Sequence, residues 1–163
     1  MRRVLGIDPG SHRLGVGCLV QSGQSIRLLA AEVIEAPRKE SLYPRLGVIQ
    51  ARLLEFIDQW KPHEAAIEDL FQHRNARSAF HLGMARGIAV AACLERKIHI
   101  YEYAPAKIKS MVAGSGRADK EQVKKMTEMQ LGLRLDLGYD ATDAIAAALC
   151  HVVSPRLDRM GIA

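Results

Sequence analysis

Aromatic residues and cysteine are both scarce in this chain: aromatic residues make up 5% of its 163 positions, and cysteine occurs three times. Cys18, Cys93 and Cys150 lie far apart and form no CxxC pair, which excludes a disulfide framework and a zinc site of the usual spacing. We therefore expect three buried thiols in a reducing compartment, the cytoplasm. Because so few aromatic residues are present, an exposed aromatic side chain would be a candidate for function.

Long apolar runs are also lacking. No stretch approaches the ~20 residues that a helix needs to span a bilayer, and Asp8 comes before the apolar core of a signal peptide could form. We expect no association with a membrane. The length fits one globular domain that needs no disulfide, which we place at residues 1–154, with residues 155–163 as a loose C-terminal tail.

Acidic residues are outnumbered by basic ones. The chain has 23 Lys and Arg against 18 Asp and Glu, a formal net charge of +5. Fixed positive charge gains affinity for polyanions by releasing their counterions. The balance favours a nucleic-acid partner without identifying one, since many basic proteins bind no nucleic acid.

The hydrophobic pattern alternates between strand-like and helix-like segments. Three apolar strands joined by short Gly-containing turns predict an antiparallel meander, and two further short strands are separated by a long helix. Such an order is typical of an α/β domain with a mixed five-stranded sheet flanked by helices. The expected strands are residues 4–7, 14–20, 26–34, 65–68 and 98–103, and the expected helices are residues 41–61, 75–95, 106–112, 119–130 and 140–153.

Three separate segments deliver carboxylates to the ends of these elements. Asp8 ends the first strand, Glu68 ends the fourth, and Asp140 and Asp143 share one face at a helix start. Clustered carboxylates repel one another unless cations neutralise them, and Mg²⁺ prefers such hard oxygen ligands. Two Mg²⁺ ions held in this way hydrolyse phosphodiesters. The four acids in this chain order therefore indicate a ribonuclease-H-like metal site.

Each of these acids also has a purely structural interpretation. Asp8 could open a β-turn at Pro9, and Glu68 could be a solvated strand end. Asp140 could cap a helix with Asp143 as the third residue of a capping box. Only the presence of all four acids together favours the metal site over these structural interpretations.

At these residues the chain resembles RuvC, the family of bacterial Holliday-junction resolvases. The resemblance covers about residues 3 to 153 and rests on several motifs in one register. They are GIDPG at residues 6–10, AIE at 66–68 with Phe71 following, NA at 75–76, GMARG at 83–87, IKS at 108–110, GRADK at 116–120 and DATDA at 140–144.

The resemblance implies a ribonuclease-H-like nuclease that resolves four-way DNA (Holliday) junctions in homologous recombination and DNA repair. It implies a homodimer, paired symmetric nicks in opposing strands, 5′-phosphate and 3′-hydroxyl ends, cutting within a short T-rich sequence, and the RuvA and RuvB branch-migration proteins as partners. Two Mg²⁺ ions per active site, with Mn²⁺ as a substitute, would be held by the positions that match the family's metal ligands: Asp8, Glu68, Asp140 and Asp143.

The same resemblance selects residues that would contact DNA. It assigns Lys109 and Lys120 to the phosphate at the cut, where either could also act in catalysis by stabilising charge. Phe71 would stack on an unpaired base, although it could equally be a core residue below the next helix. The remaining basic candidates, which could instead form a solvated helical face, are Arg74, Arg77, Lys107, Arg117 and Lys124.

Several alternatives stay open at this level. Asp69 stands where the family commonly has Gln, and an extra acid could alter metal affinity or repel a phosphate. Gly83 and Gly87 could serve a dimer interface or packing within the chain. A non-catalytic junction-binding module would leave the four acids without a purpose. An RNA/DNA-hybrid nuclease would share the fold and the chemistry of a resolvase. An actin-like kinase would need a longer, two-lobed chain.

Overall fold

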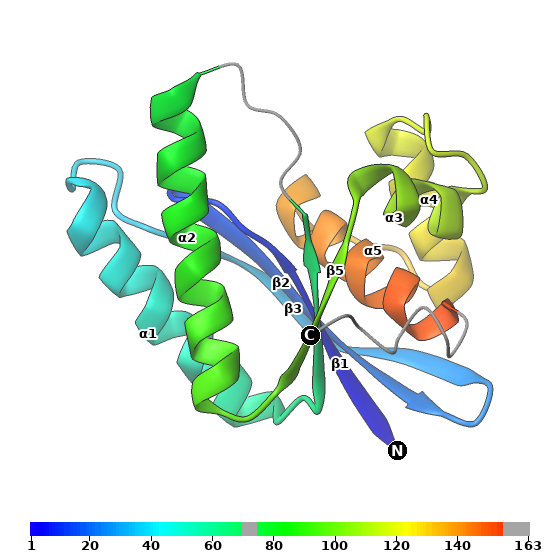
Figure 1. Ribbon diagram of the computed structural model, residues 1–163. Coiled ribbons are helices and arrows are strands. Elements are labelled where there is room, and N and C mark those ends of the chain that lie inside the picture. Colours follow the sequence, from blue (N-terminus) through cyan, green and yellow to red (C-terminus); the bar gives the residue numbers. More distant parts are fainter. Residues whose placement is uncertain (70–74, 155–163) are drawn as a thin grey trace.

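A computed structural model of the protein describes residues 1–69 and 75–154, and its centre is a five-stranded sheet in the order β3-β2-β1-β4-β5 (Figure 1). The antiparallel meander and the mixed sheet predicted from the sequence are confirmed: β1 pairs antiparallel with β2 and parallel with β4. Phe71, Arg74 and the expected tail lie outside the described residues. The strands are β1 (Arg2–Asp8), β2 (Arg13–Ser22), β3 (Ser25–Glu35), β4 (Glu64–Glu68) and β5 (His99–Tyr103).

Helices cover both faces of this sheet, which makes three layers (Figure 1). Alternate side chains of a strand point to opposite faces, and β1 shows this clearly: Leu5 and Ile7 belong to one apolar cluster, Val4 to the other. No helix in the described part of the chain is long and apolar enough to cross a membrane. On the first face lie α1 (Leu42–Trp60) and α2 (Ala76–Glu95), and on the second lie α3 (Pro105–Ala113), α4 (Lys120–Leu131) and α5 (Tyr139–Val153).

Helix α5 lies unusually close to the sheet because glycines face it. A Cβ atom at Gly6 would stand 1.8 Å from the Ala144 carbonyl oxygen, and one at Gly15 would stand 1.9 Å from the Asp140 carbonyl oxygen. The alanines of α5 are buried in this contact. The start of α5, which carries Asp140 and Asp143, is therefore fixed against β1 and β2.

The far end of α5 is held by a buried polar network. His151 is fully buried, with Nδ1 2.6 Å from the Tyr103 hydroxyl and Nε2 2.6 Å from a Glu64 carboxylate oxygen. Arg2 donates to the same carboxylate. Burial acts to raise the pKa of Glu64, but the bonds from Arg2 and His151 outweigh it and hold that pKa below its usual value. Helix α5 is thus anchored to the sheet at both ends.

Two structural interpretations drawn from the sequence are wrong. The residue that caps α5 is Gly138, without a side-chain bond, so Asp140 and Asp143 form no capping box. Asp140 lies in the first turn, where the helix dipole favours a carboxylate. Among the described residues, a Cβ atom at Gly83 or Gly87 would meet nothing within 4 Å, so these glycines do not serve packing within that part of the chain.

Other local expectations are confirmed. Ser41 precedes α1, and Asn75 caps α2 by accepting hydrogen bonds from two backbone NH groups of its first turn. All three cysteines are buried free thiols. A capping box that the sequence analysis missed opens α4, where Asp119 and Gln122 bond each other's backbone NH groups.

Candidate active site

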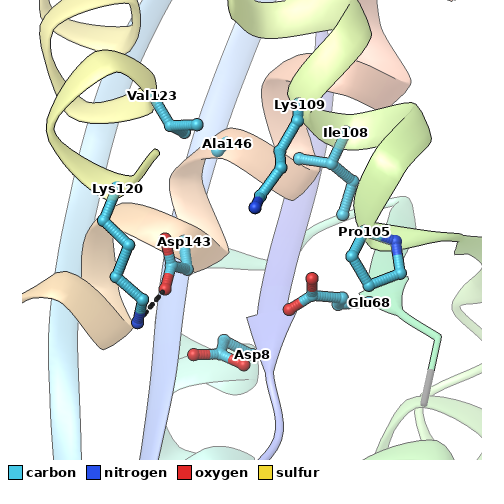
Figure 2. A pocket seen from close by; sticks show the side chains of 9 residues that line it. All are labelled: Asp8, Glu68, Pro105, Ile108, Lys109, Lys120, Val123, Asp143 and Ala146. Carbon is cyan, nitrogen blue, oxygen red and sulfur yellow. Dashed lines mark hydrogen bonds and ion pairs between the residues drawn. The ribbon is translucent and has the colours of Figure 1, made fainter. Parts of the chain in front are cut away.

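Three acids and two lysines from five different elements line one pocket of about 270 Å³ (Figure 2). Asp8 comes from β1, Glu68 from β4 and Asp143 from α5, and the lysines are Lys109 of α3 and Lys120 of α4. Pro105, Ile108, Val123 and Ala146 complete the lining with apolar surface.

The sheet register explains why the first two acids meet. Ile7 pairs with Ile67 across the parallel strands β1 and β4, so the next residues, Asp8 and Glu68, lie side by side at the same sheet edge. Both isoleucines point into the core under α1 and α2. Because strand side chains alternate, both carboxylates point to the other face, where α5 presents Asp143.

Negative charge is under-compensated in this pocket. Burial, with the charges of Glu68, Asp143 and Asp140 added, raises the pKa of Asp8 from 3.8 to about 8. Burial is also the main cause that raises the pKa of Glu68 and of Asp143 above their usual values. At neutral pH, at least one of these carboxyl groups holds a proton unless another cation replaces it.

The lysines offset part of this charge. Lys120 Nζ lies 3.3 Å from Asp143 Oδ2, and Lys109 acts on Glu68 and Asp143 through its charge. Desolvation opposes the charged form of Lys120, but the charge and hydrogen bond of Asp143 outweigh it and raise the Lys120 pKa. Lys120 is therefore positive beside Asp143, yet the pKa of Asp8 stays far above its usual value.

Asp140, the fourth predicted acid, does not line the pocket. Its Oδ2 lies 2.9 Å from Nε of Arg13, whose other guanidinium nitrogen lies 3.4 Å from Glu35. Its charge still reaches the site, because it contributes to the raised pKa of Asp8. Arg13 was missed by sequence analysis, and no motif distinguishes it, because only the fold brings the start of β2 against α5.

The four acids are not assembled as a finished ligand set. Among residues 1–69 and 75–154, no three His, Cys, Asp or Glu side chains are grouped closely enough to hold one metal ion. Unneutralised carboxylates repel one another, and here Asp143 pairs with Lys120 while Asp140 pairs with Arg13. The donor chemistry nevertheless fits a hard divalent cation, since oxygen ligands with raised pKa values are stabilised by added positive charge.

Asp69, the departure from the family pattern, is turned towards α2. Its Oδ1 lies 3.7 Å from Arg86 Nη2, and the same nitrogen lies 2.5 Å from Glu102. Asp69 does not line the pocket. Its negative charge is thus shared with a cation outside the site.

The other predicted DNA contacts that the structure describes do not line the pocket. Arg117 is exposed between α3 and α4, and Arg77 is exposed in the first turn of α2. Lys107 and Lys124 are half-buried on α3 and α4. Sequence analysis missed Tyr139, whose ring lies 5.6 Å from Lys120 Nζ and so supports that lysine by a cation–π contact.

Comparisons with known proteins identify the family. The family model for "Crossover junction endodeoxyribonuclease RuvC" matches residues 4–151. Proteins of that name from Halorhodospira halophila and Oleidesulfovibrio alaskensis are 49% and 43% identical over 151 and 157 residues. These alignments cover 93% and 96% of this chain and 90% and 94% of the relatives.

Solved structures agree with the sequence matches. A T. thermophilus RuvC in complex with Holliday junction substrate superposes with a TM-score of 0.86 at 36% identity, covering 93% of each chain. The yeast mitochondrial Holliday junction resolvase Ydc2 shares the fold at a TM-score of 0.66 and 16% identity, covering 91% of this chain and 77% of its own. With this fold, this arrangement of acids and a match along most of its length, the chain belongs to the RuvC family of crossover junction endodeoxyribonucleases.

Proposed function

We propose that this protein resolves four-way DNA junctions by paired symmetric nicks in opposing strands, leaving 5′-phosphate and 3′-hydroxyl ends. The observation that carries the proposal is the pocket where Asp8, Glu68 and Asp143 face Lys109 and Lys120. Such an arrangement suits a metal-assisted attack on a phosphodiester. A 36%-identical relative, the T. thermophilus RuvC, has been solved with a Holliday junction substrate, which supports the choice of DNA.

In the proposed reaction the metal ions and the acidic side chains have different roles. RuvC-family nucleases are metal-dependent, and two Mg²⁺ ions, or Mn²⁺ in their place, would activate the attacking water and stabilise the leaving oxygen. Asp8 and Glu68 would hold the metal, with Asp143 and Asp140 completing the ligand set. Asp140 would have to leave Arg13 to do so.

The lysines serve the phosphate. Lys109 and Lys120 line the same pocket as Asp8 (Figure 2), where their positive charge can stabilise the negative charge that develops on the phosphoryl oxygens. Lys120 is kept charged by Asp143. The remaining predicted contacts would hold the DNA beyond the pocket: Lys107, Arg117, Lys124, Phe71, Arg74 and Arg77.

Helix α2 offers the surface for a homodimer. Phe80 and Leu94 are 59% and 62% exposed, and Gly83 and Gly87 lie between them on the same exposed side with open space above. Small residues on an otherwise apolar stripe let two helices approach closely, and a twofold dimer contacts itself through identical patches. Two active sites related by a twofold axis match the near-twofold symmetry of a four-way junction. RuvA and RuvB would supply the junction.

Replacing Gly87 by Arg is expected to separate the dimer into single chains, because a long charged side chain would be forced into the apolar contact. Light scattering after size-exclusion chromatography should give the mass of one chain for Gly87→Arg and of two for wild type. On a junction, the variant should lose coordinated nicking. Gly47→Arg, at an equally open glycine of α1, is the control, and a Gly87→Arg protein that remains dimeric would refute the interface.

The function is tested with purified protein, a synthetic mobile four-way junction, a matched linear duplex and an RNA/DNA hybrid, each with Mg²⁺, Mn²⁺ or EDTA. We expect paired symmetric nicks on the junction only, lost in EDTA. Junction binding without nicks in either metal would indicate a binding module instead. Preferred cleavage of the RNA strand of the hybrid would assign a hybrid nuclease of the same fold.

A further inference from the structure

A second cavity, of about 290 Å³, lies at the same sheet edge as the metal pocket and shares none of its lining residues. His12 and Arg13 line it from the β1–β2 turn and the start of β2, and Glu35, Ala36 and Arg38 from the end of β3 and beyond. The backbone NH of Ala36 donates to the His12 carbonyl oxygen at 2.9 Å. This bond ties the two chain segments together, so the cavity is a fixed feature of the fold.

A buried arginine contacts His12, one of the residues that line this cavity. Arg45 of α1 is 6% exposed, its Nη1 lies 2.7 Å from Nδ1 of His12, and its Nε has no hydrogen-bond partner among the described residues. The half-buried Arg2 and Arg86 both pair with a carboxylate. Within the part of the chain that the structure describes, Arg45 has no such partner. A buried cation without an anion is costly, which indicates that an anion from outside completes the site.

The charges around the cavity are positive on balance. Glu35 is its one acidic lining residue within residues 1–69 and 75–154, and it is paired with Arg13, as is Asp140. Arg38 forms no ion pair among the described residues. Desolvation first, then the positive charges of Arg45, His81 and Arg38, lower the pKa of His12. Two guanidinium groups, those of Arg38 and Arg45, therefore remain to attract an anion.

The cavity is also close to the proposed site of cutting. Arg13, which lines it, is bonded to Asp140, and Asp140 precedes Asp143 of the metal pocket by three residues. Side chains at this spacing on a helix have Cβ atoms roughly 5–6 Å apart. Successive phosphates of one DNA strand rise by about 3.4 Å along the helix axis. A strand bound across the metal pocket would therefore reach the second cavity within a few nucleotides.

We propose that the cavity lined by His12 and Arg38, with Arg45 in contact with His12, binds a backbone phosphate of the DNA strand near the cut. This inference rests on the proposed function. The site would anchor the strand independently of the metal ions, on a wall that Lys109 and Lys120 do not reach. Its ligand is a phosphodiester in any sequence, so it would add affinity and not sequence preference.

Arg38→Ala tests the site without touching the metal pocket. Junction affinity is measured by fluorescence anisotropy in EDTA across a series of KCl concentrations. Loss of one phosphate contact should weaken binding roughly three- to tenfold near 0.1 M salt and reduce the slope of log affinity against log salt by ~0.9. The single-turnover cleavage rate at saturating protein and Mg²⁺ should stay within about twofold of wild type.

Two further variants make the result specific. Arg45→Gln should give the same loss of affinity. This result counts only if the thermal unfolding of the variant matches that of wild type. If the variant fails to fold, Arg38→Ala by itself tests the site. Lys97→Ala, an exposed lysine at the opposite end of the sheet, should change neither affinity nor slope.

The outcomes separate this site from the function it rests on. Suppose that the wild-type protein resolves the junction, and that Arg38→Ala binds it with the same affinity and salt dependence as Lys97→Ala. That result overturns the phosphate site but not the proposed function. So does an Arg38→Ala variant that binds normally but cuts slowly. A wild-type protein that neither binds nor cuts the junction overturns the proposed function, and the phosphate site with it.

Discussion

Replacing Asp8 by Asn is expected to slow junction cleavage by a factor on the order of 10³, the scale of losing a preorganised electrostatic group. Asp8 lines the pocket and carries the largest pKa rise among the acids described. Asparagine keeps its size but cannot neutralise a cation. The measurement is single-turnover cleavage of a four-way junction at saturating protein and Mg²⁺, with Asp136→Asn, an exposed acid outside the pocket, as control.

The same variant should be more stable than wild type when no metal is present. The pKa of Asp8 is about 8 in the folded chain against an ordinary value of 3.8, so between these pH values the folded state binds more protons than the unfolded state. The free energy of unfolding of wild type must then fall as pH rises from about 4 to about 8. The asparagine side chain does not titrate, so the free energy of unfolding of the Asp8→Asn protein does not fall for this reason.

Thermal unfolding in EDTA therefore checks the prediction. The melting temperature of Asp8→Asn should exceed that of wild type at pH 8.5, and the difference should vanish near pH 4. Each kcal/mol corresponds to roughly 2–4 °C for a domain of this size. Mg²⁺ should stabilise wild type and have little effect on the variant. Equal melting temperatures at pH 8.5 would show that the charge at Asp8 is not costly, and the site would need another explanation.

Replacing Gly15 by Ala is expected to damage stability and activity together. The new Cβ would stand 1.9 Å from the Asp140 carbonyl oxygen, a backbone atom that cannot rotate away, so the first turn of α5 must move. Overpacking of this kind costs about 1–3 kcal/mol, or roughly 2–12 °C in melting temperature. Because the shift carries Asp143 with it, cleavage should fall by about 10².

Gly47→Ala is the matched control for this substitution. Gly47 lies inside α1, is exposed, and has open space where a Cβ would stand. Alanine there should stabilise the protein by about 0.5–1 kcal/mol because glycine loses more backbone entropy in a helix. Differential scanning calorimetry of both variants and the junction assay give the comparison. A Gly15→Ala protein as active and stable as wild type would show that α5 can retreat from the sheet at no cost.

The sequence by itself determined the elements and the acids. Alternating apolar residues, the Gly-containing turns and the helix-start residues Ser41 and Asn75 are local signals, and they produced the five strands and the long helices almost to the residue. Asp8, Glu68, Asp140 and Asp143 were selected by where they end or begin elements, together with the family resemblance. Such signals depend only on neighbouring residues, which is why they can be read without a structure.

Only the tertiary structure decided how the charges pair. Arg13 with Asp140 and Arg86 with Asp69 join residues far apart in the chain, and no local pattern records such contacts. The position of Arg45 beside His12, without an ion-pair partner among the described residues, likewise follows from the packing of α1 against the β1–β2 turn. The pKa of Asp8 depends on burial and on three carboxylates from two other elements. Electrostatic energies depend on distance in space and on exclusion of water, and folding alone sets both.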